Sequence, residues 1–540
     1  MRKVQVIIMY QARHQAKPHR KQRKKGSSVL QAAGMLTVMM ALSRILGFVR
    51  DISVSSAFGI SWQADAYSAA FTIPDLIYFA LVGGGLSSAF IPVFSSYLAN
   101  GKEEDSAIMA STILNLVGLA ALGLVALGLL FTPQLVDFML DFSEERTMTL
   151  TVVLTRIMFA QCFFMCLAGI AQGILQCYKE FTIPALGAVV YNIAIIVIGL
   201  LLYRQVGIMG FTIGVVVGAV LNLLMQVRAL RQYGFGYRLV LQLHHPGVKR
   251  FFLLLLPVVL GLSMNEINLV VIQNLASSLG DGVVYALKQA QRIMMLPVGI
   301  FAAAIGLSFF PTMTDNVAKG EMGAYKQNLT MGLRMILFIT LPASVGMMVL
   351  SHPMTRAMYQ QFETTSAQVQ LVSVILVFYC IGIVGYSAQQ ILNRGFYAVQ
   401  DTKSPVLING FVLLCNIVFS VILVKLLAHR GLALAYSISG LLSMAVLGLA
   451  LRRKIGPYGG HSLIKATLQS VIASALMGVV VYMVSVGLEQ VLDVSSKLMQ
   501  IGQVCICVGV GTLVYAVLAV VMRMEEAQLM LNLVKRKLHR

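Results

Sequence analysis

Charged residues are scarce in this sequence: Asp, Glu, Lys and Arg make up 11% of the 540 residues, whereas hydrophobic residues make up 58%. Soluble domains contain about 25% charged residues, so a water-soluble globular protein is excluded. Cysteine is rare as well, and none of the seven cysteines has the Cys-x-x-Cys spacing of a metal site. We expect the cysteines to act as small residues of an apolar core.

Motifs of catalysis and nucleotide hydrolysis are also absent. The sequence has no Gly-x-x-x-x-Gly-Lys-Ser/Thr loop, no His-Glu-x-x-His zinc motif and no Gly-x-Ser-x-Gly nucleophile. We therefore expect no cofactor, no metal site and no enzymatic activity, although a membrane glycosyltransferase or ligase that uses a lone acid stays an alternative. The net charge of +20 lies mostly in tails and short loops, so nucleic acid is not an expected partner.

Long apolar runs dominate the chain instead. They recur at the length of about 20 residues that an α-helix needs to cross a membrane, and they predict an all-α polytopic membrane protein of about fourteen transmembrane helices. The first run is too long for a signal peptide and contains Arg44, so we expect a retained span. The predicted spans are residues 29 to 50, 65 to 98, 106 to 132, 148 to 176, 183 to 203, 208 to 227, 251 to 277, 282 to 313, 327 to 350, 367 to 398, 405 to 426, 431 to 451, 466 to 487 and 498 to 522.

The loops between these spans alternate in charge. The loop 228 to 250 is basic, whereas the loop 132 to 146 is acidic. Because Lys and Arg concentrate on the cytoplasmic side of membrane proteins, we predict a multi-pass protein of the cytoplasmic membrane with both termini in the cytoplasm. The basic tails are expected to touch anionic membrane lipids.

An internal repeat divides the chain. Residues 66 to 103 resemble residues 284 to 321, and in a second pair of segments Glu180 matches Asp401 at nearly the same offset of about 220 residues. An even number of spans separates equivalent points, so we predict two six-helix lobes related by a pseudo-twofold axis along the membrane normal. The predicted parts are a basic tail (1 to 28), an N-lobe (29 to 227), a basic loop (228 to 250), a C-lobe (251 to 453), two further spans (466 to 522) and a basic tail (523 to 540).

Several charges fall inside the first span or at its end. Arg44 has apolar residues on both sides, and Arg50 and Asp51 follow within two turns. An arginine near the bilayer centre costs about 3 kcal/mol on insertion scales, so a partner or an anionic ligand must compensate. Arg50 and Asp51 have a plainer interpretation, in which they lie at the membrane surface and end the span.

The eighth span carries a second group of charges. Lys288 and Arg292 lie one turn apart on one helix face, where like charges repel, and a bound anion would remove that repulsion. Glu266 in the seventh span is a candidate internal partner, and a purely structural pair of Glu266 with Arg292 is the alternative. Asp65 is expected to balance the arginines, and Arg334, near a span end, is expected to extend toward the headgroups.

Helix-breaking residues lie next to these charges. Pro74, Gly83, Gly84 and Gly85 interrupt the second span, and Pro297 lies in the eighth. These residues predict kinks or breaks. Broken helices around a central polar site are typical of transporters that work by alternating access, although Gly and Pro are also common in ordinary membrane helix packing.

Four segments resemble the MurJ (MviN) family of lipid II flippases, which belongs to the multidrug/oligosaccharidyl-lipid/polysaccharide exporter superfamily. They are LSRILGFVRD (42 to 51), ADAYSAAFTIPDLIYFALVGGGLSSAFIPVF (64 to 94), QRIMMLPVGIFAAAIG (291 to 306) and GFYAVQDTKSPV (395 to 406). The resemblance implies transport of lipid II across the bacterial inner membrane. Lipid II is the undecaprenyl-diphosphate-linked precursor of peptidoglycan, and its headgroup consists of a disaccharide and a pentapeptide. A flippase for another lipid-linked oligosaccharide is the nearest alternative.

The resemblance also implies roles for particular residues. Arg44, Arg50 and Arg292 would bind the diphosphate, and Asp65 matches a functional position of the second span. The spans within 466 to 522 would form a groove for the lipid tail. We expect a monomer, with peptidoglycan synthases as possible partners.

The sequence departs from the family at three positions. Tyr78 occupies a place where many members have a cavity arginine, and Gly83 and Met295 occupy places where some have Glu. We therefore include Tyr78 among the residues expected to contact the substrate. Lys288 is expected to replace the missing positive charge.

Overall fold

The computed structural model describes residues 27–83, 85–491 and 496–529. The first half contains α2 (Ser27–Phe58), α3 (Trp62–Ala69), α4 (Thr72–Tyr78), η1 (Phe79–Gly83), η2 (Leu86–Phe90), α5 (Ile91–Ala99), α6 (Glu103–Met139), α7 (Glu145–Cys177), α8 (Thr182–Val206) and α9 (Met209–Gln232). The second half contains α10 (Pro246–Ser277), α11 (Val283–Pro297), η3 (Val298–Ala302), α12 (Ala303–Ala318), α13 (Met322–Val349), α14 (Ser351–Tyr359), α15 (Ser366–Cys380), α16 (Ile383–Ala398), α17 (Lys403–Leu427), α18 (His429–Ile455), α19 (Gly460–Val491) and α20 (Lys497–Val521). The η elements are short π-helices.

The helical, membrane-spanning character of the chain is confirmed. Among the described residues, 11 helices are long and apolar enough to cross a membrane, and two bent pairs raise the number to 13. The first predicted span corresponds to α2, which continues to Phe58 instead of ending near residue 50. Arg50 and Asp51 therefore lie within a helix and do not end it.

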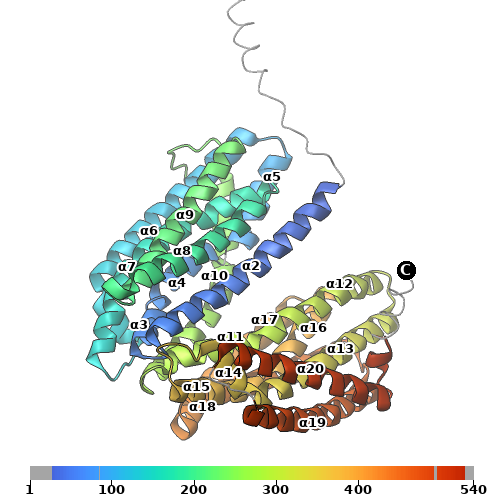
Figure 1. The fold of residues 1–540 in the computed structure, drawn as a ribbon. Coiled ribbons are helices and arrows are strands. Elements are labelled where there is room, and N and C mark those ends of the chain that lie inside the picture. The colour runs from blue at the N-terminus through green and yellow to red at the C-terminus, as the bar shows by residue number, and fades with distance from the viewer. Residues whose placement is uncertain (1–26, 84, 492–495, 530–540) are drawn as a thin grey trace, which may run out of the picture.

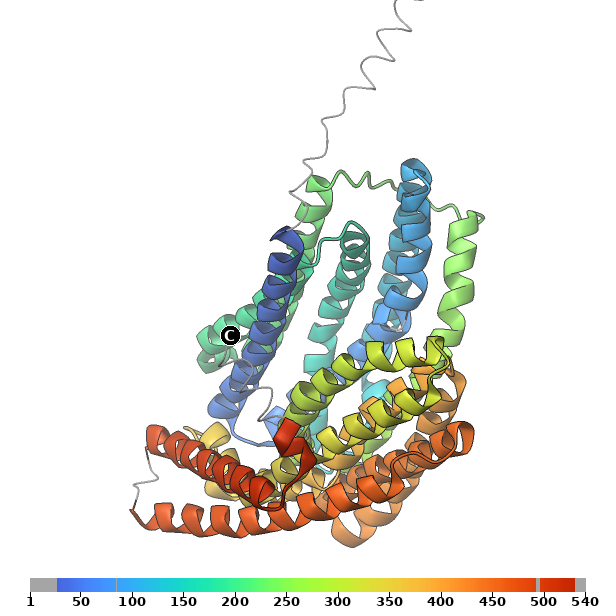
Figure 2. The ribbon, with the colours of Figure 1, turned by 90° about the vertical axis from the view of Figure 1, so that its right-hand side faces the viewer.

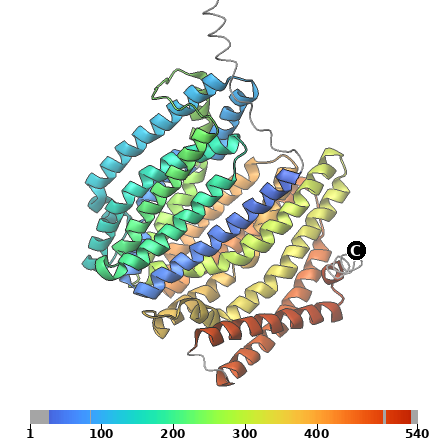
Figure 3. The same ribbon diagram turned by 45° about the horizontal axis from the view of Figure 1, so that its top comes forward.

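The helices form two bundles that meet at one end and diverge toward the other (Figure 1). We call α2 to α9 the N-lobe and α11 to α18 the C-lobe. At the closed end, α3 lies beside the start of α11 (Figure 1), whereas at the open end the start of α2 and the end of α12 are separated (Figures 1 and 2). In Figure 3, α2 lies in front, between the other N-lobe helices and the C-lobe. Helices α19 and α20 lie along the outer side of the C-lobe (Figure 2).

Helix α10 connects the two lobes. Its two parts, Pro246–Val259 and Met264–Ser277, are bent by 43° relative to each other. Phe251 in the first part packs edge-on against Phe90 of the N-lobe, whereas Gly410 of α17 lies beside Met264 in the second part. Span seven, predicted to belong to the C-lobe, thus contacts both.

Each lobe has its own apolar core, and a further core cluster joins the lobes at the closed end. That cluster includes the buried Tyr67 and Phe211 of the N-lobe and the buried Tyr285, Tyr359 and Leu376 of the C-lobe. The lobes are thus fixed to each other at one end by continuous apolar packing.

Local geometry recurs at the spacing of the sequence repeat. Lys179 and Gln400 both have a positive φ, of 61° and 58°. The next residue in each segment is an acid that accepts hydrogen bonds from the first turn of the following helix. Glu180 Oε1 accepts from the backbone N–H of Thr182 at 2.8 Å, and Asp401 Oδ1 accepts from that of Ser404 at 3.0 Å.

Both acids also bind a residue at the end of the last helix of their lobe, which is α9 in the N-lobe and α18 in the C-lobe. The Tyr233 hydroxyl donates to Glu180 Oε2 at 2.5 Å, and Lys454 Nζ lies 2.5 Å from Asp401 Oδ2. Burial raises the pKa of Glu180, but the hydrogen bonds outweigh it and the net shift is downward. Lys454, with smaller contributions from Ser404, holds the pKa of Asp401 well below its usual value.

We expect Asp401→Asn to lower the thermal midpoint at pH 7, because the charge interaction with Lys454 contributes about 0.5 kcal/mol at an exposed site. The folded pKa of Asp401 is depressed, so its contribution is present above the unfolded pKa of about 3.9 and is lost as the pH falls through the folded value. Melting curves of detergent-solubilised protein should show the two proteins converging at acidic pH. A difference in midpoint that stays constant between neutral and acidic pH would contradict this assignment.

Candidate functional site

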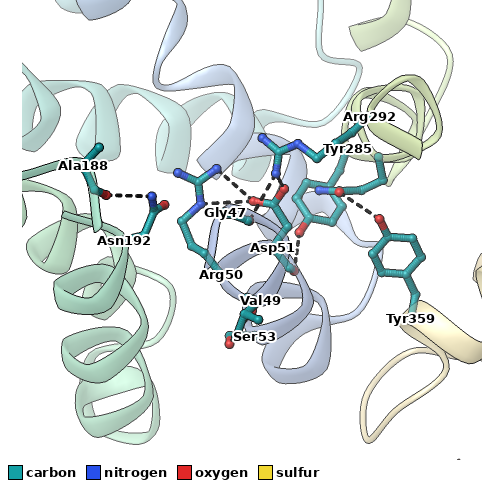
Figure 4. Close-up of polar contacts among 11 residues, drawn as sticks. Gly47, Val49, Arg50, Asp51, Ser53, Ala188, Asn192, Tyr285, Arg292 and Tyr359 are labelled. Atoms are coloured by element: carbon teal, nitrogen blue, oxygen red, sulfur yellow. Dashed lines mark hydrogen bonds and ion pairs between the residues drawn. The ribbon is translucent and has the colours of Figure 1, made fainter. Parts of the chain in front are cut away.

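The carboxylate of Asp51 joins arginines from both lobes. Arg50 donates to Asp51 Oδ1 through Nε at 3.1 Å and Nη2 at 3.0 Å. Arg292 of α11 contacts Asp51 Oδ2 through Nη1 and also donates to the Gly47 carbonyl at 3.3 Å. The Tyr285 hydroxyl donates to the Asp51 carbonyl at 2.8 Å. Figure 4 shows both guanidinium groups pointing at this one carboxylate.

Arg44 lies about two helical turns before Asp51 on α2. Its side chain is exposed, and its Nη1 atom lies 3.4 Å from the position that a Cβ on Gly299 of η3 would take. No ion pair of Arg44 is found within the described part of the chain. Arg44 therefore extends from the N-lobe toward the C-lobe with its charge uncompensated.

We call Arg44, Arg50, Arg292 and Asp51 the arginine cluster. Asp51 is 7% exposed, whereas the side chains of Arg50 and Arg292 are 18% and 30% exposed. Three guanidinium groups and one carboxylate leave a formal excess of two positive charges. Such a group favours a carboxylate or a phosphate, because a guanidinium group binds two oxygens of such an anion through paired hydrogen bonds.

Lys288 faces a different space from Arg292, although the two lie one turn apart. It lines a cavity of about 250 Å³ together with Asp75 of α4 and Glu266 of α10. Its Nζ atom lies 5.6 Å from the centre of the Phe71 ring. We call this space the Lys288 cavity; the alternative pairing of Glu266 with Arg292 is not formed.

Asp65 is placed away from the arginine cluster. It is 1% exposed, and its carboxylate accepts from the backbone N–H of Gly282 at 2.5 Å and of Tyr285 at 2.7 Å. These are free N–H groups at the start of α11, where a carboxylate is favoured by the helix dipole. Asp65 thus connects α3 of the N-lobe to α11 of the C-lobe at the closed end.

Further hydrogen bonds cross the closed end near Asp65. The Thr364 hydroxyl donates to the Ser55 carbonyl at 2.8 Å, and the backbone N–H of Glu363 donates to the Ser56 carbonyl at 3.4 Å. The geometry is tight, because a Cβ on Gly282, whose φ is +80°, would lie 2.4 Å from the Ile60 carbonyl oxygen. These contacts must break if the lobes separate here.

We expect Asp65→Ala to favour opening of the closed end by at least about tenfold. The change leaves two buried N–H groups without an acceptor, each at a cost of about 1–3 kcal/mol that water can relieve on opening. Thiol cross-linking between cysteines introduced at Ser56 and Glu363 would report the closed population, and its rate should fall. Asp281→Ala is a matched control, since Asp281 forms an exposed pair with Arg146 at the same end. Equal cross-linking in the Asp65→Ala variant and the control would contradict the assignment.

Tyr78 lies against α7 rather than in the arginine cluster. Its hydroxyl lies 3.5 Å from the position of a Cβ on Gly169, and its ring packs within the N-lobe core. The structure therefore does not bring Tyr78 together with Arg50 and Arg292.

The predicted breaks fall close to the glycines and prolines. Span two changes from η1, which ends at Gly83, to η2 after Gly85, and Gly84 lies outside the described residues. Pro74 is near the start of α4, just after a break between α3 and α4. Pro297 is the last residue of α11, and η3 follows it directly. π-Helical turns are frequent at functional sites.

Arg334 does not extend toward headgroups, so that prediction is wrong. It is 9% exposed, and its Nε lies 2.5 Å from Glu526 while its Nη1 lies 2.8 Å from Glu525. Nη1 also donates to the Ser462 hydroxyl at 2.8 Å. Arg334 therefore fixes the segment after α20 and the start of α19 to α13.

A second arginine holds the other end of the α19–α20 pair. Arg356 of α14 donates to Glu489 at 2.9 Å and to Gln503 at 2.8 Å. Between the two arginines lies an apolar cavity of about 380 Å³, enclosed by α13, α14, α19 and α20. Phe338, Met477 and Tyr515 are among its walls. The cavity suits an alkyl chain better than a polar ligand.

Sequence reasoning missed the roles of several residues. Asp51 was not included among the predicted substrate-site residues, although its place beside Arg50 was a usable signal. Thr72 and Gln273, which are hydrogen-bonded at 2.7 Å, and Ser68 also line the Lys288 cavity. No sequence pattern marks these three polar residues, because they come together only when α3, α4 and α10 pack.

Comparison with known proteins identifies a family. A family model described as Lipid II flippase MurJ matches residues 54–502. The chain is 29% identical over 429 residues to the lipid II flippase MurJ of Burkholderia cenocepacia, covering 76% of this chain and 82% of that protein. It is 29% identical over 514 residues to the probable lipid II flippase MurJ of Rhizobium tropici, covering 92% of this chain and 94% of that protein.

Solved structures give the same result for the fold. The structure described as "Lipid II flippase MurJ, inward closed conformation" matches with a TM-score of 0.77 at 27% identity, covering 90% of this chain and 98% of that chain. A multidrug resistance MATE family transporter in an inward-facing conformation matches with a TM-score of 0.65 at 15% identity, covering 80% of this chain and 99% of that chain. The second match shows a shared fold alone.

Proposed function

Because the chain belongs to the lipid II flippase MurJ family, we propose that it moves lipid II from the inner to the outer leaflet of the bacterial inner membrane by alternating access. The observation that carries the proposal is the arginine cluster, where guanidinium groups of both lobes surround one carboxylate. Its two excess positive charges match the two negative charges of a diphosphate diester. The chain is a transporter on this proposal, and no step requires catalysis.

Asp51 acts as an internal counter-ion in the proposed cycle. It compensates Arg50 and Arg292 while no cargo is bound, which lowers the cost of placing two arginines inside a membrane protein. An entering diphosphate offers more oxygen acceptors than one carboxylate and displaces Asp51 from the guanidinium groups. Binding would thereby loosen one contact between the lobes and favour their movement.

The open end faces the cytoplasm in this proposal. The basic loop between α9 and α10 and the start of α2 lie at that end (Figures 1 and 2), whereas the exposed acids Glu144 and Asp281 lie at the closed end. The positive-inside rule favours this orientation and a cytoplasmic location for both termini. The lobes would then rock against each other between inward-open and outward-open states, and the bonds around Asp65 would break when the outward-facing end opens.

The lipid tail would be held outside the central site. The cavity between α13 and the α19–α20 pair is lined mainly by apolar side chains, and its walls can hold part of a polyprenyl chain without desolvating a polar group. The protein would act as a monomer and deliver lipid II to the synthases that consume it.

Translocation of fluorescent lipid II in proteoliposomes tests the proposed function. Addition of an impermeant quencher, or of an enzyme that modifies the headgroup, would show the cargo appearing on the opposite leaflet. We expect transport that depends on the protein. Equal rates in protein-free liposomes, or transport of another lipid-linked oligosaccharide but not lipid II, would refute the assignment of substrate.

A further inference from the structure

The Lys288 cavity holds charges that the proposed diphosphate site does not use. Asp75 and Glu266 provide two carboxylates, and Lys288 provides one ammonium group, which leaves a formal charge of minus one. No hydrogen bond or ion pair within 4 Å engages any of the three in the described ranges. Charged groups in a partly dehydrated cavity are costly without a partner, so the cavity favours one additional cation.

A buried hydroxyl in the same cavity also has no partner. Ser68 of α3 is 4% exposed, its Oγ atom makes no hydrogen bond, and it lines the cavity. Buried hydroxyls are normally hydrogen-bonded. Ser68 therefore offers an acceptor for a ligand that carries N–H donors.

The remaining walls favour an organic cation over a metal ion. Apolar side chains such as Leu76, Leu269 and Ile272 cover much of the cavity. A hard metal ion prefers about six oxygen ligands, and no group of three or more His, Cys, Asp or Glu side chains in the described residues could hold one. Lys288 itself shows that an alkylammonium chain fits there, with its Nζ atom 5.6 Å from the centre of the Phe71 ring.

Size and position limit the ligand further. The cavity has a volume of about 250 Å³, which gives room for an aminoalkyl side chain. Lys288 lies one helical turn from Arg292, so the Lys288 cavity and the arginine cluster are neighbouring sites on one helix. A single headgroup could reach both.

We propose that the Lys288 cavity binds a primary amine on the peptide of the cargo headgroup while the arginine cluster binds its diphosphate. Asp75 and Glu266 are the counter-ions of the amine, and Ser68 accepts one of its N–H groups. The inference rests on the proposed function and adds that the recognised cargo is zwitterionic. Lys288 offsets one of the two carboxylate charges of the cavity, and the amine of the cargo offsets the other.

The test compares two cargoes in proteoliposomes: lipid II with a free amine on the peptide side chain, and the same lipid with that amine acetylated. We expect the wild-type protein to move the free-amine cargo about tenfold faster, the effect of one charge-assisted contact in a dehydrated site. The Asp75→Asn/Glu266→Gln double variant should move both cargoes at the slower rate. The matched control is Asp315→Asn/Glu321→Gln, which removes the same charges from exposed positions at the end of α12 and should keep the preference.

The outcomes separate this inference from the proposed function. If the wild-type protein moves neither cargo, the proposed function fails and the inference fails with it. Equal wild-type rates for both cargoes would overturn the inference and leave the function standing. A double variant that slows both cargoes equally would assign a structural role to the acids. A sodium dependence of transport that disappears in the double variant would assign the cavity to an inorganic cation. Equal slowing of both cargoes and such a sodium dependence would each overturn the proposal.

Discussion

Replacement of Arg292 by alanine is expected to lower the initial rate of lipid II translocation by about 100-fold. The change reduces the formal excess charge of the arginine cluster from two to one and removes the guanidinium group that the C-lobe places against Asp51. Hydrogen bonds to charged groups contribute about 1.5–3 kcal/mol each, and 1.36 kcal/mol corresponds to a factor of ten in rate. The measurement is the rate of fluorescent lipid II translocation in proteoliposomes at equal protein content.

Three further variants make this result specific. Arg292→Lys keeps the charge but loses the planar fork, so we expect a smaller loss of about tenfold. Arg146→Ala, which removes an exposed arginine paired with Glu144 and Asp281, should translocate normally. Lys288 was expected to replace the cavity arginine that many family members have at the position of Tyr78. If the Lys288→Ala variant moved lipid II at the normal rate while the Arg292→Ala variant did not, this expectation would be wrong.

A normal rate in the Arg292→Ala variant would refute the arginine cluster as the diphosphate site. Rescue of a flippase-depleted strain by an Arg44→Ala variant at normal protein level would count against it as well, because Arg44 contributes one of the three guanidinium groups. Both tests address the cluster directly and do not depend on the Lys288 cavity.

Replacement of Arg334 by alanine is expected to lower the free energy of unfolding by about 3–5 kcal/mol, the usual effect of leaving a buried charge without its partner. Glu526 is 2% exposed, and Arg334 Nε lies 2.5 Å from it. Several free cysteines, including Cys162, Cys166 and Cys380, are buried. A thiol-reactive dye can therefore report unfolding of the detergent-solubilised protein as a function of temperature.

Two control variants distinguish the buried pair from the exposed one. Glu525→Gln should change the free energy of unfolding by less than about 1 kcal/mol, because the Glu525 side chain is 64% exposed. An Arg334→Met/Glu526→Leu double variant should recover most of the loss, since apolar residues of similar volume often replace buried ion pairs without cost. A melting curve of Arg334→Ala that matched the wild type would show that the pair does not stabilise the α19–α20 attachment.

The positions of the helices could be predicted because the thickness of the bilayer sets the length of a membrane-spanning helix. Runs of about 20 apolar residues have few alternatives to a membrane helix, and the structure confirms a helical, multi-spanning fold. The breaks near Gly83, Gly85 and Pro297 were also predictable, since these residues weaken a helix through their own backbone chemistry. The extent of α2 was not, because Arg50 and Asp51 resemble a membrane-surface ending unless their partners are known.

The candidate site could be predicted only in part. An arginine in an apolar run signals a functional requirement by itself, and Arg50 and Arg292 do lie together. Their common partner Asp51 could not be assigned, since spans one, two and seven together offer four candidate carboxylates: Asp51, Asp65, Asp75 and Glu266. Asp65 shows the same limit: its sequence position suggested an arginine partner, whereas the structure gives it the free N–H groups of α11.

The sequence by itself determined where this protein is apolar, where its helices break and which charges require an explanation, because each of these depends on a residue and its chain neighbours. Only the tertiary structure decided which charges meet: that Asp51 bridges the lobes, that Lys288 and Arg292 face different spaces, and that Arg334 is buried against Glu526. The reason is that electrostatic and hydrogen-bond partners act over a few ångströms in space. Residues as far apart in the chain as Arg334 and Glu526, which are separated by 192 positions, come within that distance only when the helices pack.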